Sequence, residues 1–110
     1  MIVRKVWGIE SWYVNNELYC GKMLWVYPRY QCSLHRHLVK DETFYIHEGG
    51  PITLEIGEEV RVLELGDSVR IPPGTWHRFT NHEYGHALIF EVSTHHDDTD
   101  VERKEESRKI

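Results

Sequence analysis

Three histidines and one glutamate place the strongest constraint on this chain. His35 and His37 lie two residues apart, Glu42 follows closely, and His77 lies in a separate segment. Side chains two residues apart on a β-strand point to the same face, so His35 and His37 can reach one point in space. Neutral imidazoles with one carboxylate suit a borderline divalent ion such as zinc, iron, manganese, cobalt or nickel. We therefore predict that His35, His37, Glu42 and His77 bind one divalent transition metal ion.

Protein ligands of this kind leave coordination positions open, which is a property of catalytic metal sites. The alternative is a structural metal, which is less favoured because structural sites fill every position and prefer cysteine. Strand parity places Phe44, Ile46 and Phe79 inside the protein beside the ligands. The Pro-Pro-Gly bend at residues 72–74 is expected to deliver His77 to the site.

The rest of the sequence is typical of a β protein. Short segments rich in valine, isoleucine, tyrosine and tryptophan are separated by glycine, proline or asparagine, and none has the pattern of a long amphipathic helix. Many short strands at even spacing predict an all-β fold, a small antiparallel sandwich or barrel. We expect the strands at residues 12–14, 19–27, 43–47, 52–56, 60–65, 68–71, 76–80 and 87–93.

The length of 110 residues predicts one domain, residues 1–110. Residues 97–110 are highly charged and are expected to form a solvated tail, extended or briefly helical. The net charge of −5 argues against nucleic acid or an anionic membrane as a partner, because both need a basic patch. No apolar run reaches the roughly 18 residues of a membrane span, and residues 1–7 lack a signal-peptide pattern. A cytoplasmic protein is therefore the default expectation.

The cysteines and tryptophans lead to two further predictions. Cys20 and Cys32 lie in apolar, aromatic segments and are expected to be buried reduced thiols rather than a disulfide. Trp7, Trp12 and Trp25 offer apolar surface that a barrel of this size does not fully cover. We therefore predict a homodimer packed through the N-terminal strands.

Two other charged residues are candidates for a role in the site. Glu91 is a charge inside the apolar segment 88–92, where burial would be costly and would raise its pKa. We predict that Glu91 is a general base; the alternative is an outward-facing strand residue. Lys40 lies between His37 and Glu42, and either reaches the mouth of the site or belongs to a solvated loop. The other histidines are expected at the surface: His47, His82, His86, His95 and His96.

The spacing of the ligands also resembles a known pair of motifs. His-x-His-x4-Glu-x6-Gly, ending at Gly49, and Gly-x5-Pro-x-Gly-x2-His-x3-Asn, ending at Asn81, resemble the conserved motifs of the cupin superfamily. The first motif lacks its leading glycine, because Arg29 stands there after Pro28, so we expect a different turn at this point. The resemblance implies a small single-domain cupin, which is a jelly-roll barrel or double-stranded β-helix.

A second resemblance concerns activity. Residues 7–10, 35–42 and 91–103 are similar to segments of D-lyxose isomerases and of the cupin domain of type II mannose-6-phosphate isomerases. The resemblance implies interconversion of an aldose and a ketose at the predicted metal. Two departures leave the completeness of the pocket open. Lyxose isomerases are longer, and the bifunctional phosphomannose enzymes carry this module attached to another domain.

Residue by residue, the resemblance implies that Glu91 shuttles the proton, Lys40 assists at the substrate oxygens and Arg103 contacts the sugar. The substrate is expected to be a small-molecule sugar or sugar phosphate. A neutral sugar is slightly favoured, because three arginines have the parity opposite to the ligands and are expected to face outward: Arg36, Arg70 and Arg78.

Three functions are compatible with this pattern of residues. The first is a metal-dependent sugar isomerase or epimerase that works through an enediol intermediate. The second is an iron-dependent cupin dioxygenase, because three histidines and a glutamate also serve that chemistry. The third is a non-catalytic sugar-binding or regulatory cupin. A Glu91 side chain that faced solvent would favour this third function. The fold alone does not distinguish these functions.

Overall fold

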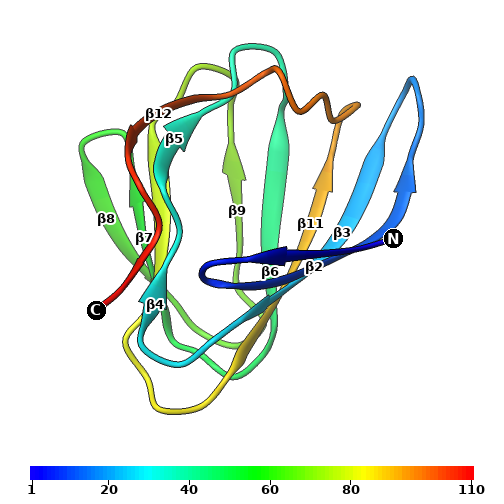
Figure 1. Cartoon of the computed structure of the whole chain (residues 1–110). Helices are drawn as coiled ribbons and strands as arrows, with labels where there is room; N and C mark the ends of the chain where they lie inside the picture. Colours follow the sequence, from blue (N-terminus) through cyan, green and yellow to red (C-terminus); the bar gives the residue numbers. More distant parts are fainter.

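A computed structural model describes residues 1–110 as two antiparallel β-sheets that face each other, without any helix (Figure 1). The strands are β1 (Ile2–Lys5), β2 (Gly8–Asn15), β3 (Cys20–Val26), β4 (Tyr30–Gln31), β5 (Leu34–Arg36), β6 (Glu42–Glu48), β7 (Ile52–Ile56), β8 (Glu59–Leu63), β9 (Ser68–Ile71), β10 (His77–Asn81), β11 (Ala87–Ser93), β12 (Glu102–Glu105) and β13 (Arg108–Lys109). One sheet has the order β1-β2-β3-β11-β6-β9. The other follows β12-β5-β10-β4-β13, with β7 paired to β10 and to β8. The predicted all-β fold, a small antiparallel barrel of the jelly-roll type, is confirmed.

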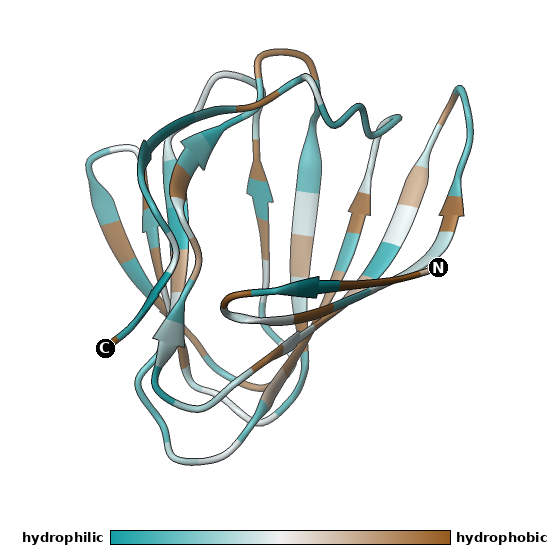
Figure 2. Cartoon of the chain, viewed as in Figure 1, coloured by the Kyte–Doolittle hydropathy of each residue, from teal (hydrophilic) through white to brown (hydrophobic).

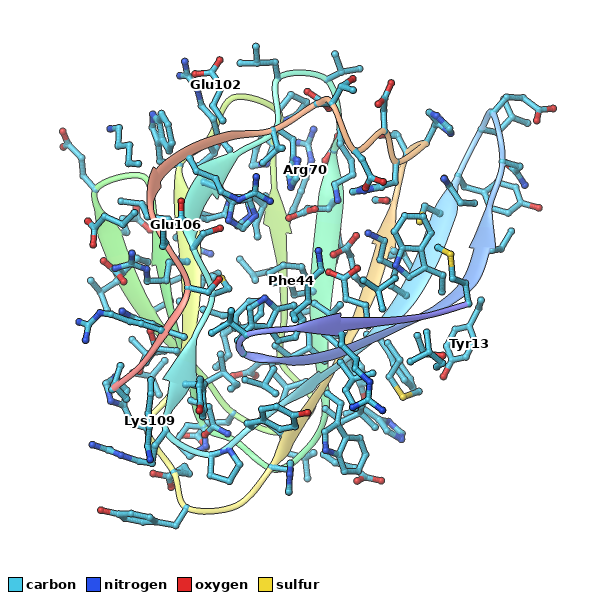
Figure 3. All side chains as sticks on the ribbon, viewed as in Figure 1. Tyr13, Phe44, Arg70, Glu102, Glu106 and Lys109 are labelled. Atoms are coloured by element: carbon cyan, nitrogen blue, oxygen red, sulfur yellow. The ribbon has the colours of Figure 1, made fainter.

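Apolar side chains fill much of the space between the sheets. Fifteen buried residues form one hydrophobic cluster, which includes Phe44, Ile46 and Phe79 as parity predicted. Trp7, in the turn between β1 and β2, packs edge-on against Phe79 with 4.9 Å between ring centroids. Figure 3 shows Phe44 inside the barrel and Tyr13 pointing away from it. The alternation of inward and outward positions along each strand therefore decides which residues reach the interior.

The C-terminal segment, residues 97–110, is extended and mostly exposed, in line with the expectation of a solvated extended segment, but it does not hang free of the barrel. Strand β12 pairs with β5, and β13 pairs with β4, so this segment extends the wall of the barrel. Its side chains are mostly exposed and hydrophilic (Figure 2). Backbone hydrogen bonds at the sheet edge hold this segment in the fold. Its sequence therefore needs no alternation of apolar residues, and none could be detected.

Strand β10 departs from the parity rule that was applied to the arginines. Arg36 and Arg70 are partly or largely exposed, as predicted, but Arg78 is buried. Its Nε donates to Cys32 O at 3.2 Å, and its Nη2 donates to Glu105 of β12 at 3.0 Å. Every residue of β10 is buried, because the strand is central in its sheet and side chains of neighbouring strands contact its outward positions, as Glu105 does at Arg78 and Gln31 at Thr80.

Two backbone positions explain how the N-terminal half is shaped. Arg29 has a φ of 62°, a left-handed conformation that favours glycine, so the turn keeps this geometry without the glycine. The backbone N–H of Ile110 donates to Arg29 O at 2.9 Å, and Arg29 Nη1 donates to His82 O at 2.8 Å, which holds the turn. Gly8 leaves room for β3, because a Cβ at this position would lie 1.9 Å from Trp25 O.

Cys20 and Cys32 are both buried free thiols, as predicted. Burial raises the pKa of Cys32 to about 12, so this thiol stays protonated. The chain contains no helix that is long and apolar enough to cross a membrane.

Candidate metal centre

The four predicted ligands converge at one end of the barrel interior. His35 belongs to β5, His37 follows this strand directly, and Glu42 and His77 begin β6 and β10. His35 and His77 are opposite each other in paired strands. One imidazole nitrogen from each histidine lies within 4.8 Å of the other two. Glu42 Oε1 lies 2.9 Å from His77 Nε2, and Glu42 Oε2 lies 3.7 Å from His37 Nε2.

Each of the three histidines is oriented by a hydrogen bond from its Nδ1 to a backbone carbonyl. The pairs are His35 with Ser33 (2.8 Å), His37 with Asp100 (2.7 Å) and His77 with Thr75 (2.9 Å). This arrangement assigns the proton to Nδ1 and leaves the Nε2 lone pair of each ring available to a metal. His77 Nε2 and Glu42 Oε2 are buried and form no well-aligned hydrogen bond within the chain. Such buried polar atoms need a partner, and a divalent ion would supply one.

Electrostatics prepare these groups for coordination. Burial lowers the pKa of His35 to about 3, assisted by His77, and burial lowers the pKa of His37 to about 4, assisted by Lys40. Both rings are therefore neutral at pH 7, as metal ligands must be. Burial alone would raise the pKa of Glu42, but contacts with His77 and Lys40 outweigh it and lower this pKa. The donor set is three imidazoles and one carboxylate, which fits a borderline divalent ion.

Lys40 lies neither at the mouth of the site nor in a solvated loop, because its side chain is only 3% exposed. Its Nζ lies 2.9 Å from Glu42 Oε2, 3.2 Å from Glu91 Oε2 and 3.1 Å from His96 Nδ1. Burial alone would lower the pKa of Lys40, but the two carboxylates outweigh it and raise this pKa. Lys40 is therefore a buried cation that bridges the predicted metal ligand Glu42 and the predicted base Glu91.

Glu91 extends inward from β11 and is buried, so it is not an outward-facing strand residue. Burial raises its pKa, the negative charge of Glu42 adds to this effect, and the charges of Lys40 and Lys22 oppose it. A carboxyl group with a raised pKa is suited to exchange protons near neutral pH. Glu91 is therefore a buried carboxyl group in the wall of the cavity, paired with Lys40.

His96 was expected at the surface, but it lines the same cavity. Its Nε2 lies 2.8 Å from Asp98 Oδ1, and its ring packs edge-on against Trp12 with 4.9 Å between centroids. The side chain of Asn15 holds the backbone of His96 through hydrogen bonds at both N–H and C=O. Sequence spacing gave no signal here, because the position of His96 depends on the loop after β11 and on contacts with β2.

Asp100 links the C-terminal segment to the ligands and was not identified from the sequence. Its carbonyl accepts the hydrogen bond from His37, and its carboxylate accepts hydrogen bonds from the backbone N–H groups of Leu38, Val39 and Lys40 at 2.8 to 3.2 Å. One residue therefore orients a ligand and holds the loop that carries Lys40. Such supporting contacts tune metal affinity.

A cavity of about 370 Å³ adjoins this arrangement. Its walls carry His35, His37, Lys40, Glu42 and Glu91. Its rim is formed by residues 4–7 of the β1–β2 hairpin and by four residues of the C-terminal segment: Val101, Arg103, Glu106 and Ser107. These two segments lie at the front of the barrel in Figure 1, in blue and red. Arg103 lies on the rim, on β12 opposite His35. The cavity is large enough for a small-molecule ligand.

Comparisons with known proteins agree with this architecture. Residues 23–93 match the protein family described as Cupin domain. A D-lyxose ketol-isomerase from Thermofilum sp. is 36% identical, and the match covers 74% of this chain and 59% of the relative. A D-lyxose/D-mannose isomerase from Thermosediminibacter oceani is 30% identical, with 78% of this chain and 61% of the relative covered. The chain therefore spans about three fifths of the length of these two relatives.

The fold also recurs in solved structures of low sequence identity. Oxalate decarboxylase from Bacillus subtilis superposes with a TM-score of 0.81 at 17% identity, covering 94% of this chain and 29% of that chain. A likeness at this identity concerns the fold alone. The family match, the two relatives and the shared fold thus agree with the resemblance of the sequence motifs to those of the cupin superfamily.

Proposed function

This chain belongs to the cupin domain family, and from its site we propose that it is a metal-dependent isomerase or epimerase of sugars. The observation that carries the proposal is the position of Glu91. This buried carboxylate lines the same cavity as His35, His37 and Glu42 and is joined to Glu42 through Lys40. The two isomerase relatives support the choice of a sugar as the substrate, either neutral or phosphorylated.

The metal would be held by His35, His37, Glu42 and His77. A divalent ion at these residues would polarise the carbonyl of an open-chain sugar and stabilise negative charge on its oxygen. The backbone carbonyls that accept the Nδ1 hydrogen bonds keep the three rings oriented. The metal is one transition ion of the group zinc, manganese, iron, cobalt and nickel.

Glu91 acts as the general base in this mechanism. It removes the proton from C2 of the aldose, the electron pair of the broken C2–H bond forms the C1–C2 double bond, and the carbonyl electron pair moves to O1, which gives an enediolate. Transfer of the O2 proton to O1 and return of the proton from Glu91 to C1 then give the ketose, with the new carbonyl at C2. Lys40 keeps the Glu91 carboxylate in position, and Arg103 on the rim contacts the distal part of the sugar. A positioned base of this kind contributes roughly 10²–10⁴-fold to the rate.

The test is proton NMR of the metal-loaded protein with a panel of aldoses and ketoses in D2O. We expect one aldose to lose its C2 proton signal, and a chelator to stop the exchange. No exchange across pentoses, hexoses and their phosphates would contradict the proposal. In that case, oxygen consumption that requires iron would favour a dioxygenase, and sugar binding without exchange would favour a binding protein.

We also propose that the protein forms a homodimer through its N-terminal strands. Three large side chains on these strands are 38 to 63% exposed: Ile2, Tyr13 and Trp25. Ile9, Met23 and Trp25 line a shallow apolar hollow on the outer face of β2 and β3. A second copy would cover this face. Light scattering at micromolar concentration tests the proposal, and a monomeric mass contradicts it.

A further inference from the structure

The two lysines buried in the cavity differ in how completely their ammonium groups are bonded. An ammonium group can donate three hydrogen bonds. Lys40 Nζ has three partners within 3.2 Å, two carboxylates and one imidazole. Lys22 is equally buried, with a side-chain exposure of 2%, but the nearest oxygen of its ion-pair partner Glu10 is 3.6 Å away. This distance is too long for a hydrogen bond. Lys22 therefore retains donors that the chain itself does not satisfy.

The position of Lys22 directs these donors into the cavity. Lys22 lies on β3 between β2 and β11, opposite Trp12 on one side and Glu91 on the other. Side chains at paired positions in adjacent strands lie on the same face, so Lys22 is a direct neighbour of Glu91. Its Nζ lies over the Trp12 ring, 4.0 Å from the centroid, which fixes the ammonium group. Both Lys22 and Glu91 line the cavity.

Glu10 complements Lys22 with an acceptor. Trp12 Nε1 donates to Glu10 Oε1 at 2.9 Å and thereby holds the carboxylate. The other oxygen, Oε2, accepts no hydrogen bond from the chain, and Nζ of the rim residue Lys5 lies 4.0 Å from it. Glu10 lines the cavity, and its side chain is 12% exposed. An unsatisfied donor and an unsatisfied acceptor therefore lie side by side in the cavity wall, next to Glu91.

We infer that Lys22 and Glu10 form a binding subsite for one hydroxyl group of the sugar. A hydroxyl group both accepts and donates a hydrogen bond, so it satisfies Lys22 and Glu10 together. A phosphate group does not suit this position, because the carboxylates of Glu10 and Glu91 would repel it. The inference rests on the proposed function in one respect, since it takes a sugar as the ligand. Lys22 is then the lysine that contacts the substrate, rather than Lys40, whose ammonium group is surrounded by Glu42, Glu91 and His96.

The experiment measures binding rather than turnover. D-arabinitol is a five-carbon alditol without a carbonyl group, so it presents hydroxyl groups and cannot be isomerised. We expect isothermal titration calorimetry of the zinc-loaded protein to show binding that Lys22→Met weakens roughly 10- to 100-fold, the effect of one hydrogen bond from a charged donor. Glu10→Gln should weaken it less, because the amide oxygen can still accept a hydrogen bond.

Lys5→Met is the matched control. Lys5 also pairs with Glu10 and also lines the cavity, but its side chain is 36% exposed and lies on the rim. Its loss should change the affinity by no more than about twofold, because exposed ion pairs contribute little. Equal effects of Lys5→Met and Lys22→Met would mean that only the overall charge matters, and would overturn the subsite.

A measurement on the unaltered protein guards against misfolding of the variants. With ¹³Cε-labelled lysine, D-arabinitol should shift the Lys22 methylene signal and leave those of Lys40 and Lys5 in place. No shift of the Lys22 signal, or no binding of the alditol at all, overturns the subsite. Alditol binding that depends on Lys22, without proton exchange on any aldose, would keep the subsite and refute the isomerase. Proton exchange on an aldose, with a KM that is unchanged in Lys22→Met, would keep the isomerase and refute the subsite.

Discussion

The two ends of the barrel interior differ in chemistry, although both are built from inward-facing positions of the same strands. On β3, β6, β10 and β11, the positions at one end hold Lys22, Glu42, His77 and Glu91, and those towards the other end hold Val26, Ile46, Phe79 and Ile89. A shift of two to four residues along a strand thus separates a charged site from an apolar core. Strand parity fixes what faces inward, and residue type alone decides which end becomes a site.

The apolar end stabilises the fold, whereas the polar end does so only weakly. Buried apolar side chains gain free energy in proportion to the area they remove from water. The charged end holds two lysines and three carboxylates: Lys22, Lys40, Glu10, Glu42 and Glu91. Replacing buried ion pairs with apolar residues is often neutral or stabilising. The charges are therefore explained by chemistry at the site, and their excess of one negative charge favours a cation.

Removal of one metal ligand should have the largest effect and should leave the fold in place. His77→Ala is expected to lower metal affinity by more than about 100-fold, beyond the 10–100-fold loss that follows removal of a supporting partner. Activity should fall to background. Metal titration and thermal unfolding in the presence of a chelator measure both effects. A variant that binds the metal normally would show that the polar end is not built around an ion.

Replacement of the base should separate chemistry from metal binding. Glu91→Gln keeps the shape of the side chain, and its expected loss of turnover is roughly 10²–10⁴-fold, equivalent to about 2.7–5.4 kcal/mol. The metal should remain bound, because Glu91 is not one of the four ligands. Initial rates and metal content of the purified variant measure the two quantities. If more than about a tenth of the activity remains, the loss is far smaller than this expected range, and the role of Glu91 as base is refuted.

The apolar end should respond in the opposite sense. Phe79 lies two residues after His77 on β10 and is 3% exposed. Phe79→Ala should lower the free energy of unfolding by about 3–5 kcal/mol, because it opens a cavity in the core. The metal affinity of the folded fraction should stay within the range of the unaltered protein. Urea unfolding of the metal-free protein gives the first number. Equal stability losses for Phe79→Ala and His77→Ala would remove the distinction between the two ends.

The sequence predicts those parts of the site that strand parity controls. The ligands lie at the spacing of paired motifs, and Glu91 is a charge within an apolar strand, so both could be predicted. Lys22 offered the same signal, a charge within the apolar segment Cys20–Val26, and could have been found by the same argument. His96 could not, because its loop is positioned by contacts with a distant strand.

The parts of the fold that escaped prediction depend on backbone contacts between distant segments. Strands β12 and β13 are held at sheet edges by main-chain pairing, so their side chains carry no pattern of burial. The burial of Arg78 was missed because side chains of other segments, such as Glu105, cover its outward position, which a two-residue alternation does not reveal. Arg29 adopts a left-handed backbone conformation that favours glycine, and hydrogen bonds with Ile110 and His82 hold it there. Local pattern therefore predicts strand interiors better than edges and loops.

The smallest predicted effect concerns Asp100, which joins the charged C-terminal segment to the polar end. Burial alone would raise the pKa of Asp100, but hydrogen bonds from the backbone N–H groups of Lys40, Leu38 and Val39 outweigh it and lower this pKa. A carboxyl group whose pKa is lower in the folded state contributes stability above its unfolded pKa of about 3.9, and this stability is lost as the pH falls further. Asp100→Asn should therefore cost roughly 1 kcal/mol at pH 6, an effect reduced by solvent near the surface.

The pH dependence distinguishes this role from simple loss of packing. Below about pH 4, Asp100 takes up a proton in the unfolded chain before it does so in the folded protein, which favours unfolding, so the stability difference from Asp100→Asn should shrink towards zero as the pH falls. Urea unfolding of the two metal-free proteins from pH 3 to pH 6 measures this difference, and the other titrating groups cancel because both proteins contain them. A difference that stays constant with pH would mean that the charge of Asp100 does not hold the loop. The polar end would then owe its geometry to the strands alone, as the apolar end does.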